Sequence, residues 1–275
     1  MSSARLSANQ KAQYEQDGYL IVKKFLDSEE VALFSGLATG DTVRNNAFDL
    51  KDQSGKYTKL TLWFTPGNDT FGLLTRSEKI VNAAQTLLGD GEVCHFHSKL
   101  LQKEPKVGGA WEWHQDYGYW YKNGFLYADA LISVMFAITE ATKQNGCLQV
   151  LKGSHKMGRF EHNFAGEQQG ADMPFVEEAM KRCERVYVEL QPGDFLFFHP
   201  NLLHMSEANL SNKPRWSLIS AYNLSYNVPF REKNTSCITP VKIVPDQAVL
   251  TSNAVGLSEQ ADFLHKEDEI TLKVQ

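Results

Sequence analysis

The sequence of 275 residues contains no long hydrophobic run and no excess of positive charge. Its longest apolar stretches, such as residues 130–138, are about half the length that a helix needs to cross a bilayer. The formal net charge of −5 gives no basic surface that would favour nucleic acid or an anionic membrane. We therefore expect neither a membrane nor a nucleic acid as a partner, and the sequence leaves the oligomeric state open.

Closely spaced cysteines are also missing. The four cysteines lie far apart and include no Cys-x-x-Cys pair; they are Cys94, Cys147, Cys183 and Cys237. This spacing predicts reduced thiols rather than a disulfide framework or a zinc ribbon. Because the first ten residues are polar and lack the apolar stretch of a secretory signal, we expect a cytoplasmic protein.

The pattern of apolar residues changes near residue 91. Before it, capping residues and glycines predict helices at 7–17, 27–38 and 77–91, a strand at 18–26, and a long loop or hairpin at 39–60. After it, short apolar runs separated by Gly, Pro and Asn turns, without helices between them, predict an antiparallel sandwich or barrel. The polar stretch 160–182 is expected to hold at most one short helix.

The economical interpretation is one domain over residues 1–275. Its parts are a mostly helical N-terminal cover with a loop at 1–91, a β core at 92–230 with an insertion at 156–182, and a C-terminal extension at 231–275.

The stretch "WEWHQDYGYW", residues 111–120, places His114 and Asp116 two positions apart among aromatic residues. In an extended strand, residues two apart point to the same face, so both side chains can reach one ion. With a histidine from far along the chain they would form a 2-His-1-carboxylate triad, which leaves open positions on ferrous iron. The segment "PGDFLFFHPNLLHMSEAN" offers His199 and His204. A His-x-Asp pair alone is weak evidence, because a histidine bonded to a neighbouring acid on a solvated face has the same spacing.

Arg215 follows His204 by eleven residues and precedes an apolar strand. An arginine there can form a bidentate salt bridge with the far carboxylate of a 2-oxo diacid. A surface arginine after a turn is the ordinary alternative.

Four segments of the chain occur in the same order as the motifs of a known enzyme family. They are "YEQDGYLIVKKFLDSEEV", "HQD", "NGCLQVLKGSHKMG" and "PGDFLFFHPNLLHMSEANLSNKPRWSLISAYN". Together they resemble the phytanoyl-CoA dioxygenase (PhyH) family of Fe(II)/2-oxoglutarate-dependent oxygenases, which includes ectoine hydroxylase. The resemblance covers most of the chain. It implies a jelly-roll core of the double-stranded β-helix (cupin-like) type, and a non-haem iron dioxygenase that uses Fe(II), 2-oxoglutarate and O2.

The resemblance also implies roles for individual residues. It assigns the iron ligands to His114, Asp116 and His204, and the 2-oxoglutarate carboxylate to Arg215 with Ser206 beside it. The aspartate at 116 favours hydroxylation, because halogenating relatives carry a small residue there.

Further positions are assigned more loosely. Lys99 and Met135 fall where family members contact the co-substrate, and Gln102 is an alternative to Lys99. His199 takes a structural role, because it lacks the eleven-residue relation to the arginine. We expect His155 to stabilise its turn, and His95 and His97 to be packing residues or neighbours of the ligands rather than ligands.

The aromatic residues around the motif are expected mainly to shield the iron. The candidates for substrate contact are Trp113, Tyr117, Tyr119 and Trp120. Aromatic faces attract ammonium groups, so we expect a small polar or amine-bearing metabolite. The alternatives are a fatty acyl-CoA, whose phosphates an acidic chain suits poorly, and a natural-product intermediate. A catalytically silent binding or sensor protein of the same fold, and a zinc hydrolase, are the competing hypotheses from different functional classes.

Overall fold

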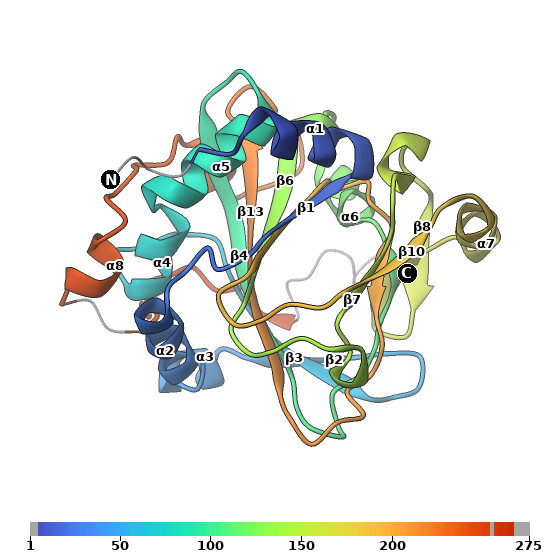
Figure 1. Ribbon diagram of the computed structural model, residues 1–275, viewed down its shortest axis with the longest axis horizontal. Helices are drawn as coiled ribbons and strands as arrows, with labels where there is room; N and C mark the ends of the chain where they lie inside the picture. The colour runs from blue at the N-terminus through green and yellow to red at the C-terminus, as the bar shows by residue number, and fades with distance from the viewer. Residues whose placement is uncertain (1–4, 254–255, 267–275) are drawn as a thin grey trace.

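Two antiparallel sheets face each other in the computed structural model, which describes residues 5–253 and 256–266 (Figure 1). The seven-stranded sheet consists, in spatial order, of β1 (Tyr19–Val22), β11 (Phe195–Phe198), β6 (Leu131–Ala137), β13 (Arg215–Leu224), β4 (Val93–Lys103), β3 (Tyr57–Trp63) and β2 (Phe48–Lys51). The four-stranded sheet consists of β10 (Arg185–Val188), β7 (Leu148–Leu151), β12 (His204–Ser206) and β5 (Trp111–His114). These two sheets give the predicted mainly β, jelly-roll architecture.

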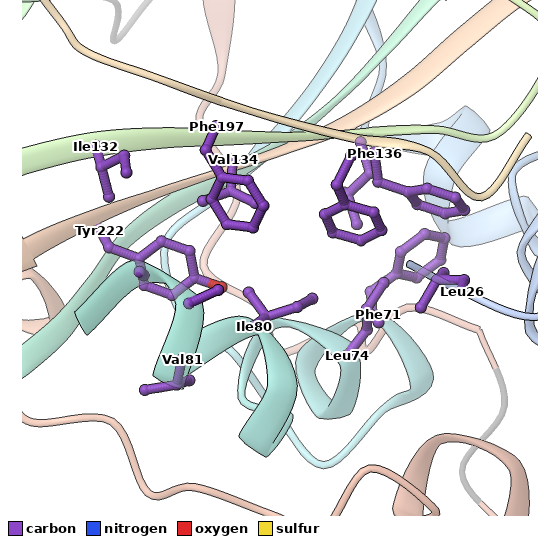
Figure 2. Packing of buried hydrophobic residues seen from close by; sticks show 14 of the residues in the cluster. Leu26, Phe71, Leu74, Ile80, Val81, Ile132, Val134, Phe136, Phe197 and Tyr222 are labelled. Carbon is purple, nitrogen blue, oxygen red and sulfur yellow. The ribbon is translucent and has the colours of Figure 1, made fainter. Parts of the chain in front are cut away.

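Helices cover the outer face of the larger sheet, as Figure 1 shows. They are α1 (Ala8–Asp17), α2 (Ser28–Leu37), α3 (Asp41–Asn45), α4 (Thr70–Thr75) and α5 (Glu78–Leu88), with α8 (Ala248–Thr251) beside α4. Helix side chains such as Leu74 and Ile80 pack against Val134 and Phe136 of β6 (Figure 2). The helices before residue 91 therefore form a cover over this face of the sheet.

The apolar run at 130–138 is explained by burial of both faces of β6. Ile132, Val134 and Phe136 pack toward the helices, whereas Met135 and Ala137 belong to the cluster between the two sheets. Because both faces of such a strand are buried, its sequence is continuously apolar and does not alternate between apolar and polar residues.

The N-terminal part contributes strands as well as cover. Residues 39–60 include α3 and the start of a hairpin in which β2 pairs with β3, and this hairpin extends the larger sheet. β1 adds the opposite edge strand, paired with β11. The sheet therefore begins well before residue 92.

Two helices interrupt the strands after residue 91: one falls in the stretch 160–182, where a short helix was expected, and the other was not expected. α6 (Asp116–Asn123) follows β5 directly, and α7 (Met173–Arg182) follows a hairpin of β8 (His162–Ala165) and β9 (Gln168–Ala171). The insertion at 156–182 is thus more ordered than its polar composition suggested. The last part of the expected C-terminal extension, 267–275, and residues 254–255 lie outside the described residues. Among the helices described, none combines the length and the apolar character needed to cross a membrane.

Candidate active site

Three buried side chains, His114, Asp116 and His204, converge at one end of the four-stranded sheet. Their ligand atoms lie within 4.8 Å of one another. The Nε2 atoms of His114 and His204 lie 3.8 Å and 3.9 Å from Oδ1 of Asp116. Within the described part of the chain, no other set of three His, Cys, Asp or Glu residues meets this geometry.

The two histidines are brought together by strand pairing. His114 ends β5 and His204 begins β12, and the two residues are direct partners in the antiparallel ladder. Asp116 does not lie in the same strand, as the spacing had suggested, but is the first residue of α6. The turn from strand to helix therefore brings the carboxylate to the histidines.

Gln115, between the two predicted ligands, fixes this turn. Its side-chain nitrogen donates to the carbonyls of Gly158 and Asn201, each at 2.7 Å, and its side-chain oxygen accepts from the Phe160 backbone at 2.6 Å. Its own backbone N–H donates to Nε2 of His162 at 2.9 Å. A fully bonded, buried glutamine thus holds the two neighbouring side chains in place.

Backbone carbonyls set the tautomer of both histidines. Nδ1 of His114 lies 2.7 Å from the carbonyl oxygen of Glu112, and Nδ1 of His204 lies 2.9 Å from that of Leu202. Because a carbonyl only accepts, each Nδ1 carries the hydrogen and each Nε2 presents its lone pair. Burial lowers the pKa of both imidazoles below the usual value, so both are neutral near pH 7.

The Asp116 carboxylate is held in its charged form. Burial alone would raise its pKa, but the Lys99 ammonium and a hydrogen bond from Ser133 favour the charged form, and the pKa is lowered. Lys99 Nζ lies 3.9 Å from Oδ1, and the Ser133 hydroxyl donates to Oδ2 at 2.5 Å. Two neutral imidazoles and one carboxylate are the donor set of non-haem ferrous iron, and these residues fit that ion.

Arg215 is buried at the start of β13. Its Nη2 contacts the Met135 sulfur at 3.9 Å, and no carboxylate among the described residues forms an ion pair with it. Burial lowers the pKa of its guanidinium to about 10, so the group remains charged at pH 7. A buried cation without a protein anion is suited to the carboxylate of a ligand.

Of the two candidates on β4, only Lys99 faces the ligand triad. Gln102 lies on the opposite face of the strand and donates to the carbonyl of Ala38 at 3.1 Å, in the N-terminal cover. The assignment of Gln102 to the co-substrate is therefore not supported by its position.

A cavity of about 970 Å³ opens next to the triad. Its wall includes His97, Lys99, His114 and Asp116, and it also includes much of the C-terminal segment 232–242. The cavity does not reach Arg215, Ser206 or Met135, which lie deeper between the sheets. The predicted C-terminal extension is thus part of the cavity wall.

The four aromatic candidates divide into two pairs. Tyr119 and Trp120 line the cavity. Trp113 faces away and packs with Leu151 in a separate cluster, and Tyr117 turns its hydroxyl to the carbonyl of Phe125 at 3.0 Å. Trp113 and Tyr117 are therefore not in a position to contact a ligand in the cavity.

Sequence reasoning missed several residues around the site. Trp111 lines the cavity, Ser133 binds the aspartate ligand, and Lys103 donates to Ser206 at 2.7 Å. Ser133 could have been predicted as a site residue from the sequence, because it is the one polar residue in an otherwise apolar strand.

The remaining histidines lie outside the triad. Both ring nitrogens of His95 are bonded, to Phe64 and Ser98, and those of His199 are bonded to Asp129 and Asn201. His155 bonds the carbonyl of Glu15 at 3.2 Å.

The comparison with known proteins agrees with this geometry. The family model described as phytanoyl-CoA dioxygenase (PhyH) matches residues 14–217, about three quarters of the chain. The chain belongs to the phytanoyl-CoA dioxygenase family. The predicted enzyme class, a non-haem iron 2-oxoglutarate-dependent dioxygenase, is therefore confirmed.

Curated members of the phytanoyl-CoA dioxygenase family are similar along most of their length. An ectoine dioxygenase of Streptomyces avermitilis is 26% identical, with 76% of each chain covered. An L-proline trans-4-hydroxylase of Streptomyces griseoviridis is 24% identical, with 80% of this chain and 87% of the relative covered. Among solved structures, EctD from S. alaskensis with bound Fe has a TM-score of 0.73 at 22% identity over 89% of both chains. This last likeness shows the shared fold.

Proposed function

We propose that this dioxygenase hydroxylates an unactivated C–H bond of a small polar, amine-bearing metabolite, with iron held by His114, Asp116 and His204. The observation that carries the proposal is the convergence of two bare Nε2 atoms and a charged carboxylate at the wall of a large cavity. Iron bound there supplies the oxidising chemistry, in which O2 and 2-oxoglutarate are consumed and succinate and CO2 are released.

The protein's own residues position the reactants. Arg215, which has no ion-pair partner among the described residues, offers a buried charge for the distal carboxylate of 2-oxoglutarate, and Lys99 keeps the Asp116 carboxylate ionised. Ser133 occupies one oxygen of that carboxylate and leaves the other for the metal. The aromatic wall around the triad excludes water from the reacting carbon.

The nature of the cavity wall supports the proposed substrate class. Trp111, Tyr119 and Trp120 offer aromatic faces, and Glu232 adds an acidic group to the same cavity, whereas Glu167 is already paired with Lys266 at 2.7 Å. Aromatic faces and carboxylates both attract a cationic amine. The curated relatives named for ectoine and L-proline are consistent with a small nitrogen-bearing substrate. The cavity volume of about 970 Å³ makes a larger natural-product intermediate the second candidate.

Succinate release tests the proposal. The purified protein is supplied with ferrous iron, 2-oxoglutarate and O2, and succinate is measured alone and with each member of a panel of small amines, amino acids and ectoine. A true substrate raises succinate release and gains the mass of one oxygen atom. The control variant His114→Ala should release none. Absence of succinate with every compound, together with zinc in the purified protein, would contradict the proposal.

A further inference from the structure

A second buried cation lies beside Arg215. Lys103 ends β4 and is the direct register partner of Arg215 on β13, so the two side chains lie on the same face of the sheet. Lys103 is 1% exposed, and among the described residues neither cation forms an ion pair with a carboxylate. Two adjacent buried cations without an anion are costly for a protein, and they favour a bound anion.

Within the part of the chain that the structure describes, Lys103 makes three hydrogen bonds, all to one short segment. Its Nζ lies 2.6 Å from the carbonyl oxygen of Glu207, 3.2 Å from that of Ser206, and 2.7 Å from the Ser206 hydroxyl oxygen. The two carbonyls can only accept, so they take two of the ammonium hydrogens. The third hydrogen is donated to the Ser206 hydroxyl oxygen. The hydroxyl hydrogen of Ser206 then remains available to another acceptor.

This hydrogen-bond direction depends on the charge of Lys103. A neutral amine that donates to both carbonyls has only a lone pair left, and it would accept the Ser206 hydrogen instead. Burial and Arg215 lower the pKa of Lys103, while Asp52, Cys147 and Glu207 oppose that change. An anion bound beside Lys103 favours the charged form, and therefore favours the orientation in which Ser206 donates.

We propose that Lys103 is a positioning residue for the distal carboxylate of 2-oxoglutarate, which it serves by turning the Ser206 hydroxyl into a donor beside Arg215. The proposal rests on the co-substrate site described under the proposed function. It adds a residue that neither contacts the metal ligands nor lines the cavity. The pair of cations makes the site selective for a 2-oxo acid with a second carboxylate.

Binding to two 2-oxo acids tests the proposal. The iron-loaded protein is titrated without O2 with 2-oxoglutarate and with 2-oxobutyrate, which lacks the distal carboxylate, and the dissociation constants are measured by calorimetry. Lys103→Met should weaken 2-oxoglutarate about ten- to hundredfold, as expected for a lost charge-assisted interaction, and leave 2-oxobutyrate nearly unchanged. Equal weakening of both acids, or of neither, would overturn the proposal. Succinate release by the wild-type protein tests the proposed function separately.

Two control variants distinguish a positioning role of Lys103 from a general loss of structure. Lys79→Met removes another poorly exposed lysine, which pairs with Glu30 at 2.6 Å in the N-terminal cover, and should change neither affinity. If Lys103 acts through Ser206, the double variant Lys103→Met/Ser206→Ala should bind 2-oxoglutarate about as weakly as Ser206→Ala alone. Additive losses in the double variant would show that Lys103 does not act through the hydroxyl.

A crystal structure of the wild-type protein with iron and 2-oxoglutarate, grown without O2, tests the contact without any substitution. We expect the Ser206 hydroxyl within hydrogen-bond distance of both Lys103 Nζ and the distal carboxylate. A hydroxyl turned away from the carboxylate would contradict the proposal even if Lys103→Met fails to fold.

Discussion

Ser133 and Asp116 join the two sheets at the candidate metal site. Ser133 lies on β6 of the larger sheet, and its hydroxyl donates to Oδ2 of Asp116, which directly follows β5 and Gln115 of the smaller one. Oδ1 of the same carboxylate faces His114 and His204. One oxygen is thus fixed by the protein, while the other faces the two histidines.

Replacement of Ser133 by alanine should weaken iron binding without abolishing it. The change leaves Oδ2 unpaired and lets the carboxylate rotate, and loss of such a supporting contact typically costs about 10- to 100-fold in metal affinity. Anaerobic titration with ferrous iron measures the effect. Ser217→Ala is a matched control, because the Ser217 hydroxyl is also buried but has no hydrogen-bond partner among the described residues. Equal affinity in the Ser133 variant and the control would refute the role of this contact.

The identity of the distal ligand can be tested with a pair of histidines. His204→Ala should abolish iron binding, because it removes one of three converging ligand atoms. His199→Ala should retain iron, because both nitrogens of His199 are engaged elsewhere. Iron content after reconstitution and gel filtration distinguishes them. An iron-free His199 variant beside an iron-loaded His204 variant would reverse the assignment.

Substitution of Arg215 should weaken the binding of 2-oxoglutarate without weakening the binding of iron. Arg215→Met should raise the dissociation constant for 2-oxoglutarate by roughly a hundredfold or more, because it removes the charge that faces the carboxylate. Iron affinity in the absence of 2-oxoglutarate should stay within about twofold of wild type, because Arg215 is not among the converging ligands. A parallel loss of iron would indicate general damage to the site instead.

The convergence of His114, Asp116 and His204 was predicted from the order of the sequence motifs and the family resemblance that they carry. The two histidines meet through the register of β5 and β12, whereas Asp116 reaches them through the turn into α6, which the two-residue spacing did not predict. The sequence could not decide which of Lys99 and Gln102 faces the site. β4 is buried on both faces, and the apolar residues Leu100 and Leu101 lie on opposite faces, so neither face stands out as the inner one. No polar alternation marks the inner face of such a strand.

Other errors came from elements with weak local signals. α6 has aromatic residues and a central glycine, which are poor helix formers, and its start is fixed by contacts of Gln115 with distant residues. Trp113 could have been excluded, because a residue adjacent to His114 in a strand points to the opposite face.

The pH dependence of stability should include a contribution from His95. Burial lowers the pKa of His95 to about 3, below the ordinary value of 6.5, so between these values the unfolded chain binds a proton that the folded protein does not. The free energy of unfolding should therefore fall as the pH falls below about 6.5, with a slope approaching roughly 1.4 kcal/mol per pH unit from this group. Urea unfolding of the metal-free protein between about pH 4 and 7 measures the slope. His95→Gln should flatten it by that amount, and parallel curves would contradict the assignment.

Gly118 tests whether the packing under α6 holds the aspartate ligand in place. A Cβ at this position would overlap the ring of His162, the residue whose Nε2 accepts from the Gln115 backbone. Gly118→Ala should therefore destabilise the protein by about 1–3 kcal/mol and also weaken iron binding, because a displaced His162 releases the turn that carries Asp116. Gly36→Ala in α2 has nothing within 4 Å and should stabilise by about 0.5–1 kcal/mol with no change in iron affinity. Urea unfolding and iron titration of both variants measure the two effects. A Gly118 variant that loses stability but binds iron normally would show that the turn is held by Gln115 alone.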